Sequence, residues 1–211
     1  CLTGIPLSQL HSSKEGIYET VKDLEGQLIV KEYPTKSASP NTIRAHLERL
    51  LQRDIKPDMI IVDYADLLKP NVVRKEKRHE LETIYEDLRG ISQEMSCPCY
   101  TASQTNRSGL NAEVITMESI SEAFNKCFVA DFIFSVSRTV QDKNTNGGRM
   151  FLAKNRNGPD GLIYPIFMDT SCVKIKVLPS DGTTLEQSMI KTAAAQKEEL
   201  QKKYREFRRS K

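Results

Sequence analysis

The chain has 211 residues, 38% of them hydrophobic and 28% charged, which is enough for one domain with a substantial core. No apolar run approaches the ~20 residues that a membrane-spanning helix requires, so the composition indicates a soluble globular protein without a membrane segment. The net charge of +3 is unevenly spread, because residues 191–211 hold eight Lys/Arg and three Glu, a net of +5, and the remaining chain carries −2. We expect a domain over residues 1–180 and a charged helical tail over 181–211. The charge of the tail is better explained by a solvated helix face than by a contact with nucleic acid or a partner.

The five cysteines show no CxxC pair and no histidine at the spacing of a zinc site. Cys97 and Cys99 form the only cluster, and they lead into an apolar run typical of a buried strand. We therefore predict reduced core cysteines and a cytosolic or equivalent reducing compartment. The sequence opens on Cys1 rather than Met and shows no signal-peptide pattern, which favours a start inside a longer reading frame or after processing.

The first thirty residues predict a helix and then a strand. Ile17, Val21 and Leu24 lie at helical spacing, and Gly26 is expected to end that helix. Gln27–Val30 has the apolar composition of a short strand. The sequence therefore predicts one helix followed by one strand at the start of the chain.

The next seventy residues or so predict helices and buried strands in alternation. Ser39, followed by proline, is a typical N-cap, and the apolar residues of Ile43–Leu51 recur at helical spacing. The continuous apolar run Met59–Val62 is typical of a strand buried on both faces. A helical stripe from Leu81 to Met95 then leads to a second buried strand, Cys99–Ser103. A strand, a helix and a strand in this order predict a parallel βαβ unit.

The last part of the domain changes to short strands joined by Asn/Gly turns, after a helix-like segment that follows Thr116. The predicted strands are Phe132–Ser137, Met150–Ala153, Leu162–Met168 and Cys172–Leu178. The predicted fold class is therefore α/β, with a mainly parallel central sheet flanked by helices and a C-terminal antiparallel meander added to that sheet.

Asp63 and Gln104 each follow a predicted parallel strand at its carboxyl end, where open α/β sheets bind ligands. In nucleotide hydrolases an acid at this place holds Mg²⁺, usually through water, beside the β- and γ-phosphates. The amide of Gln104 could sense a γ-phosphate. Both residues also have an ordinary interpretation, because Asp is common where a strand enters a loop and Gln often binds its own loop backbone.

Lys154 and Arg156 are two residues apart on a predicted strand, so both cations point the same way. Two cations aimed at one place suit a triphosphate, whose transition-state charge they would stabilise. The alternative is an exposed pair that discourages aggregation at a hairpin edge. The residues alone leave these two interpretations open.

The order of these features resembles the RecA-like ATPase domain of DnaB-type replicative DNA helicases, a P-loop NTPase core of which this chain would hold only part. The matching segments are IIVDYADLL (Ile60–Leu68), ASQTNR (Ala102–Arg107), ADFIFSVSR (Ala130–Arg138), AKNRNGPDG (Ala153–Gly161) and, for phage-type members, CLTGIPLSQL (Cys1–Leu10). The Lys-Asn-Arg-Asn-Gly-Pro run is the most specific of them. The resemblance spans about residues 1–178 and leaves the tail outside.

The resemblance implies a role for each candidate residue, with ATP and Mg²⁺ as cofactors. Asp63 would be the Walker B acid that coordinates Mg²⁺ through water, and Gln104 the γ-phosphate sensor. Lys154 and Arg156 would act in trans, with Arg156 as the arginine finger that reaches the nucleotide of a neighbouring subunit. A finger of this kind implies an oligomer, which in this family is a hexameric ring around single-stranded DNA.

Single-stranded DNA, a primase or a helicase loader would be the partners of such a ring in a bacterial or phage-infected cell, with no membrane partner. Loops after the Asp63 and Gln104 strands would face the channel of the ring. The candidate phosphate contacts there are Arg74, Lys75, Lys77, Arg78, Asn125 and Lys126. Each is equally well interpreted as a solvated loop residue.

Two departures from the family pattern stand out. None of the ten glycines is followed by Lys, so the G-x-x-x-x-G-K-[ST] phosphate loop is absent from these 211 residues, which alone should not hydrolyse ATP. The usual Arg-Glu-Ser-Gly run is replaced by Ser121–Phe124, which puts the second DNA loop in doubt. The alternatives are another RecA-fold ATPase, such as a recombinase, and a RecA-like module that binds nucleic acid or a partner without hydrolysis. Tyr64 after the acid favours the helicase.

Overall fold

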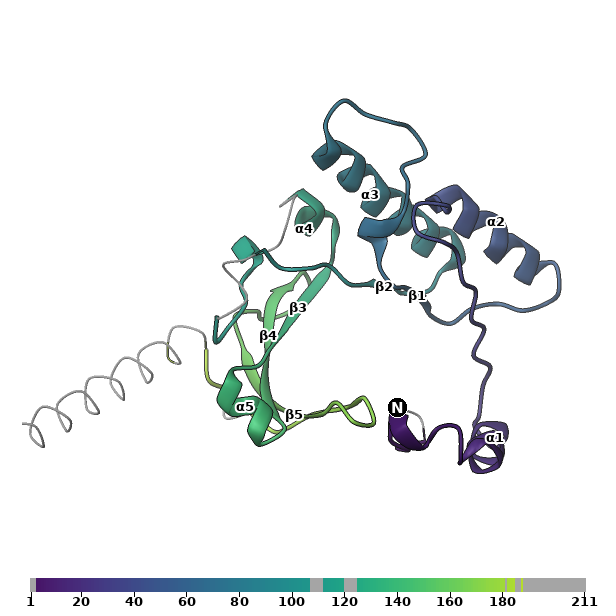
Figure 1. Ribbon diagram of the computed structural model, residues 1–211. Helices are drawn as coiled ribbons and strands as arrows, with labels where there is room; N and C mark the ends of the chain where they lie inside the picture. The colour runs from purple at the N-terminus through teal and green to yellow at the C-terminus, as the bar shows by residue number, and fades with distance from the viewer. Residues whose placement is uncertain (1–2, 107–111, 120–124, 181, 185–186, 188–211) are drawn as a thin grey trace, which may run out of the picture.

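The computed structural model describes residues 3–106, 112–119, 125–180, 182–184 and 187 (Figure 1). The α-helices are α1 (Lys14–Lys22), α2 (Pro40–Leu51), α3 (Lys77–Met95), α4 (Asn125–Val129) and α5 (Val140–Asn144). Short 3₁₀ helices lie at η1 (Leu7–Gln9), η2 (Ala65–Leu67) and η4 (Met117–Ser119). The strands are β1 (Ile60–Val62), β2 (Cys99–Thr101), β3 (Phe132–Ser137), β4 (Gly147–Asn155), β5 (Ile163–Asp169) and β6 (Lys174–Val177). Of the charged helical tail predicted over 181–211, only residues 182–184 and 187 are among the described residues.

The predicted βαβ unit is confirmed. β1 and β2 pair in parallel, from Ile60 opposite Cys99 to Val62 opposite Thr101, and α3 connects them. α2 begins with the predicted cap, in which Ser39 and Thr42 each accept a hydrogen bond from the other's backbone N–H. The apolar faces of α2 and α3 close over β1. Their buried core consists of Leu47, Ile60, Ala65, Leu81, Ile84, Leu88, Ile91, Met95 and Cys97.

Three strand predictions in this half of the chain are wrong. β2 is not the buried strand that was expected, because Cys99 is half-buried and Tyr100 and Thr101 are exposed. Ile60 is buried but Ile61 is 69% exposed, so β1 is covered on one face only by the described residues. Gln27–Val30 forms no strand, and Leu28 and Val30 are 74% and 80% exposed. A strand needs a neighbour for its backbone N–H and C=O groups, and none of the described strands pairs with this segment. It runs instead as an extended connection between α1 and α2 (Figure 1).

The predicted meander is confirmed as a four-stranded antiparallel sheet in the order β3-β4-β5-β6. Phe151, Ala153 and Ile163 form its small buried core, with Ile133 packed against them. The expectation that this meander extends the parallel sheet is wrong among the described strands, because β1-β2 and β3-β6 form two separately hydrogen-bonded sheets. α4 directly precedes β3 in the chain and packs on α3 (Figure 1).

The N-terminal helix α1 is present as predicted, but none of its residues is buried. Gly26 follows it with a φ of +98°, a conformation that suits the end of this helical segment. α1 lies apart from α2 and α3, at the far end of the extended connection (Figure 1). The segment before it touches the antiparallel sheet, since the Leu7 backbone N–H donates to the Ser171 carbonyl at 3.0 Å.

The described cysteines are free thiols, as predicted. Cys97, Cys127 and Cys172 are buried, and burial raises the pKa of Cys99 to about 11. These thiols therefore belong to the packing of the fold. Across the described residues, no helix is both long enough and apolar enough to span a bilayer.

Candidate functional site

Asp63 directly follows β1, at the carboxyl end of the parallel pair, and its side chain is exposed. The position is the one predicted from the sequence, where ligands of open α/β sheets bind. In the described part of the chain, no group of three or more His, Cys, Asp or Glu residues could hold a metal ion. A single accessible carboxylate fits Mg²⁺, which is commonly held by one or two carboxylates together with phosphate oxygens and water.

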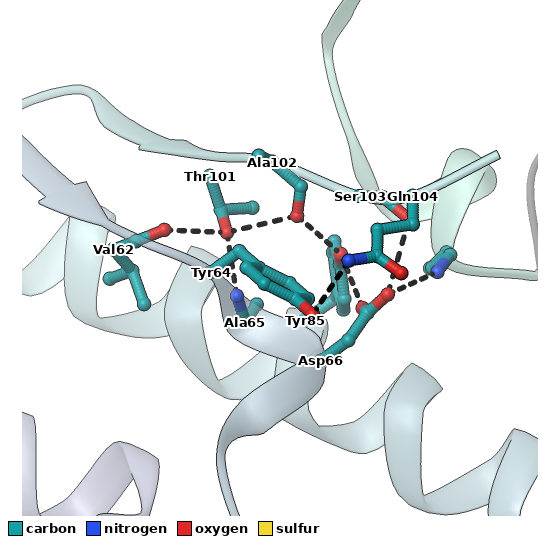
Figure 2. Close-up of polar contacts among 10 residues, drawn as sticks. Val62, Tyr64, Ala65, Asp66, Tyr85, Thr101, Ala102, Ser103 and Gln104 are labelled. Atoms are coloured by element: carbon teal, nitrogen blue, oxygen red, sulfur yellow. Dashed lines mark hydrogen bonds and ion pairs between the residues drawn. The ribbon is translucent and has the colours of Figure 1, made fainter. Parts of the chain in front are cut away.

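The turn after Asp63 is tied to the end of β2 through Thr101 (Figure 2). The Thr101 hydroxyl donates to the Val62 carbonyl at 2.9 Å and accepts the Ala65 backbone N–H at 2.9 Å. Ala65 is fully buried, so its N–H has no access to water. One hydroxyl therefore fixes the backbone on both sides of Asp63.

Gln104 does not end β2 as predicted, because the strand stops at Thr101, opposite the last residue of β1. Ala102–Gln104 nevertheless continues beside the turn after Asp63. The Gln104 amide donates through Nε2 to the Tyr64 hydroxyl at 3.0 Å (Figure 2). The structure thus brings Gln104 to the residue that follows Asp63, and the side chain of Gln104 is exposed.

A second set of polar side chains converges on Asp66, and we call Asp66, Tyr85, Ser103 and Lys126 the Asp66 cluster. Figure 2 labels the first three of these residues. One carboxylate oxygen of Asp66 accepts the Tyr85 hydroxyl at 2.8 Å. The other accepts the Lys126 ammonium at 2.9 Å and the Ser103 hydroxyl at 3.2 Å. The Lys126 side chain is 2% exposed and its Nζ lies 5.7 Å from the centroid of the Tyr85 ring.

Burial, followed by the negative charge of Asp66, raises the pKa of Tyr85 far above its ordinary value. Because its pKa is raised, Tyr85 keeps its proton at neutral pH and donates it to the Asp66 carboxylate. Sequence reasoning did not find this cluster. Tyr85 falls within the helical stripe from Leu81 to Met95, and nothing in the sequence distinguishes Asp66, three residues after Asp63.

The structure places Asn125 and Lys126 differently from what a DNA contact would require. Lys126 is buried in the Asp66 cluster, and the Asn125 amide donates to Glu82 on α3 at 3.1 Å. Both side chains point at the protein in this structure. The sequence could not show this, because the acids that bind them are sixty and forty-three residues away.

The cations from Arg74 to Arg78 lie where α3 begins. Arg78 forms an ion pair with Glu76 at 2.6 Å, and the Arg74 backbone N–H donates to Glu80 at 2.9 Å. A hollow of about 350 Å³ lies here, lined by Arg74, Lys75, Glu76, His79, Glu82, Thr83 and Glu86. The lining holds two cations, Arg74 and Lys75, and three glutamates, so this end of α3 is mixed in charge.

Lys154 and Arg156 lie at the end of β4, next to α4. The Lys154 ammonium donates to the carbonyls of Cys127 and Phe128, at 2.8 and 3.1 Å, in the last turn of α4. A cation is favourable there, because these carbonyls carry the negative end of the helix dipole. Burial, and then the charge of Arg156, lowers the pKa of Lys154.

Arg156 is the accessible member of this pair, with 46% of its side chain exposed. Its guanidinium binds the Asp131 carboxylate at 2.9 Å. Arg89 on α3 binds the same carboxylate oxygen at 3.0 Å and the Val129 carbonyl at 2.6 Å. The described residues thus form two groups, Asp63 with Gln104 at the end of the parallel sheet and Lys154 with Arg156 beside α4.

The fold is α/β, with a parallel strand pair connected by α3 and a separate four-stranded antiparallel sheet. A family model described as the DnaB-like helicase C-terminal domain matches residues 5–174, and the chain belongs to this family. This assignment favours the helicase over the recombinase-like alternative.

Two relatives agree with the family. A DnaB-like replicative helicase of Enterobacteria phage T4 is 34% identical over 122 residues, which are 56% of this chain and 26% of that protein. A probable replicative DNA helicase of Trieres chinensis is 26% identical over 140 residues, which are 61% of this chain and 30% of that protein. The chain therefore spans less than a third of the length of either relative.

Two solved structures share the fold. The ATPase domain of G40P matches with a TM-score of 0.68 and 17% identity, over 84% of this chain and 68% of that one. A structure of a DnaB-like replicative helicase and its interactions with primase matches with a TM-score of 0.69 and 16% identity, over 84% of this chain and 47% of the other. At these identities the likeness concerns the fold alone.

Proposed function

We propose that this chain forms part of the ATPase domain of an ATP-dependent replicative DNA helicase, which moves as a ring along single-stranded DNA and unwinds duplex DNA. The observation that supports the proposal is the hydrogen bond from the Gln104 amide to Tyr64, the residue that follows Asp63 at the carboxyl end of β1. Membership of the DnaB-like helicase family supports it.

In this proposal Asp63 would hold Mg²⁺ through water, and the ion would supply positive charge to stabilise the transferred phosphoryl group. Gln104 donates its amide to the γ-phosphate and passes the presence of that phosphate to Tyr64. Arg156 reaches the nucleotide of the neighbouring subunit, which requires an oligomer such as a hexamer. Its exposed guanidinium would exchange Asp131 for the phosphate, while Lys154 stays behind it against α4.

The chain shows no phosphate loop among its glycines, and the α- and β-phosphates need such a cradle of backbone N–H groups. We therefore propose that hydrolysis requires a polypeptide that supplies this loop. Single-stranded DNA would meet the cations of Arg74–Arg78, and a primase or helicase loader would bind the assembled ring. The fold likeness to a helicase studied with primase is consistent with such a partner.

The test compares the chain alone with the chain joined to a polypeptide that carries a G-x-x-x-x-G-K-[ST] loop. We expect no Mg²⁺-dependent ATP hydrolysis by the chain alone, and hydrolysis stimulated by single-stranded oligonucleotide after joining. Asp63→Asn should abolish that hydrolysis, whereas Asp58→Asn, before β1, is the matched control and should leave it unchanged. Hydrolysis that survives Asp63→Asn would contradict the assignment of the magnesium acid.

A further inference from the structure

Lys126 carries a buried charge that the proposed reaction does not use. Its ammonium is 2% exposed, and it binds Asp66 at 2.9 Å while lying over the face of the Tyr85 ring. A buried ion pair rarely stabilises a fold more than apolar residues of the same volume would, because both charges lose their hydration. An ion pair instead needs a particular distance and direction between its two charged groups. It therefore fixes the two elements that carry these groups relative to each other.

The elements fixed here are the turn after β1 and helix α4. Asp66 lies three residues after Asp63, and it also accepts the hydroxyl of Ser103, the neighbour of Gln104. Lys126 is the second residue of α4. The pair therefore attaches α4 to the place where the proposed magnesium acid and phosphate sensor meet.

The other end of α4 holds the second group of the site. Lys154 binds the carbonyls of Cys127 and Phe128 there, and Arg89 binds that of Val129. α4 is only five residues long, so a shift at Lys126 moves the carbonyls that Lys154 binds. Arg156 follows two residues later along the same strand.

We propose that Lys126, acting through Asp66, is a positioning residue that connects the end of the parallel sheet to the Lys154–Arg156 group by way of α4. This inference rests on the proposed function for its consequence in catalysis. The competing assignment is the one predicted from the sequence, in which Lys126 contacts DNA phosphate.

The first experiment uses the chain as it is and does not depend on ATP or DNA. Lys126→Met, Asp66→Leu and the double variant are compared with the wild type by amide hydrogen exchange of α4 and of Ser103–Gln104. Asp66→Leu leaves the buried Lys126 ammonium without its anion, and Lys126→Met leaves the partly buried Asp66 carboxylate without its cation. We therefore expect exchange in both places to become about 100-fold faster. In the double variant, where no charge is left unpaired, exchange should return to within about tenfold of the wild type.

Arg44→Met is the matched control, because Arg44 pairs with Glu94 at 2.8 Å on the surface of α2 and α3. An exposed pair contributes little, and exchange in α4 should not change. Unchanged exchange in Lys126→Met would overturn the pairing of Lys126 with Asp66. The same conclusion would follow if the effects of the two single substitutions on exchange simply added in the double variant.

The second experiment separates positioning from stability in the chain joined to its phosphate loop. If Lys126 and Asp66 position the site, the double variant should keep the wild-type KM for ATP, whereas its kcat should be about tenfold lower. A double variant that is as stable as the wild type and has its full kcat would overturn the positioning role. If no joined protein hydrolyses ATP, the proposed function fails. The hydrogen-exchange comparison of the single and double variants still decides whether Lys126 and Asp66 hold α4 in place.

Discussion

Replacement of Thr101 by Val removes one hydroxyl from the backbone around Asp63 and keeps the volume of the side chain. The Ala65 N–H, which is fully buried, then loses its acceptor, and the Val62 carbonyl loses a donor. A buried N–H without a partner costs ~1–3 kcal/mol, and the lost bond at the carbonyl adds about 1 kcal/mol or less. We expect Thr101→Val to lower the free energy of unfolding by about 2 kcal/mol.

Urea unfolding followed by circular dichroism measures this loss, and Thr101→Ser is the matched control. Serine keeps the hydroxyl and loses a methyl group from an exposed residue, so its stability should stay within about 0.5 kcal/mol of the wild type. The Ala65 amide of Thr101→Val should exchange about 30-fold faster, the factor that corresponds to 2 kcal/mol. Equal stability of the Val and Ser variants would refute the claim that this hydroxyl holds the turn.

Three further outcomes follow from other contacts. Ile91→Ala, at a fully buried position of the α3 core, should cost ~3 kcal/mol in urea unfolding, and a loss below 1 kcal/mol would contradict that packing. Burial raises the pKa of Asp142, but hydrogen bonds with Thr139 and the Arg149 cation outweigh it and hold the pKa below its ordinary value. The stability that Asp142 contributes is therefore present above its unfolded pKa of about 3.9 and is lost as the pH falls through its lower folded pKa. Asp142→Asn lacks this titrating carboxylate. The part of the stability that the wild type loses through Asp142 at low pH should therefore be absent from the variant's loss on acidification. In the joined protein, Arg156→Ala should abolish ATP hydrolysis and leave nucleotide binding intact, as equilibrium binding of a fluorescent ATP analogue would show.

Much of the fold could be predicted because its signals are local. The N-cap at Ser39, the apolar stripe of α3 and the Asn/Gly turns of the C-terminal meander depend on residues that are close in sequence. Gln27–Val30 and the outer face of β1 were predicted wrongly for one shared reason. Strand pairing and the covering of a sheet face depend on other segments, and an apolar run does not reveal whether such segments are present.

The site was predictable to the extent that its residues follow strand ends. Asp63 could be placed from the apolar run before it, and Arg156 from the Lys-Asn-Arg-Asn-Gly-Pro run. Lys126 could not be placed, because a cation near a loop has the same appearance in the sequence whether it is solvated or buried. Only the fold brings Asp66 within 2.9 Å of its ammonium.

The most direct test of the central claim is a subunit-mixing measurement of ATP hydrolysis in the joined protein. Asp63→Asn and Arg156→Ala should each be inactive alone, since one lacks the magnesium acid and the other the finger. In mixed oligomers, some interfaces combine an intact Asp63 from one subunit with an intact Arg156 from its neighbour. The account predicts that mixing the two inactive variants restores hydrolysis stimulated by single-stranded DNA. Mixtures that stay inactive, although both variants assemble and bind nucleotide, would contradict it.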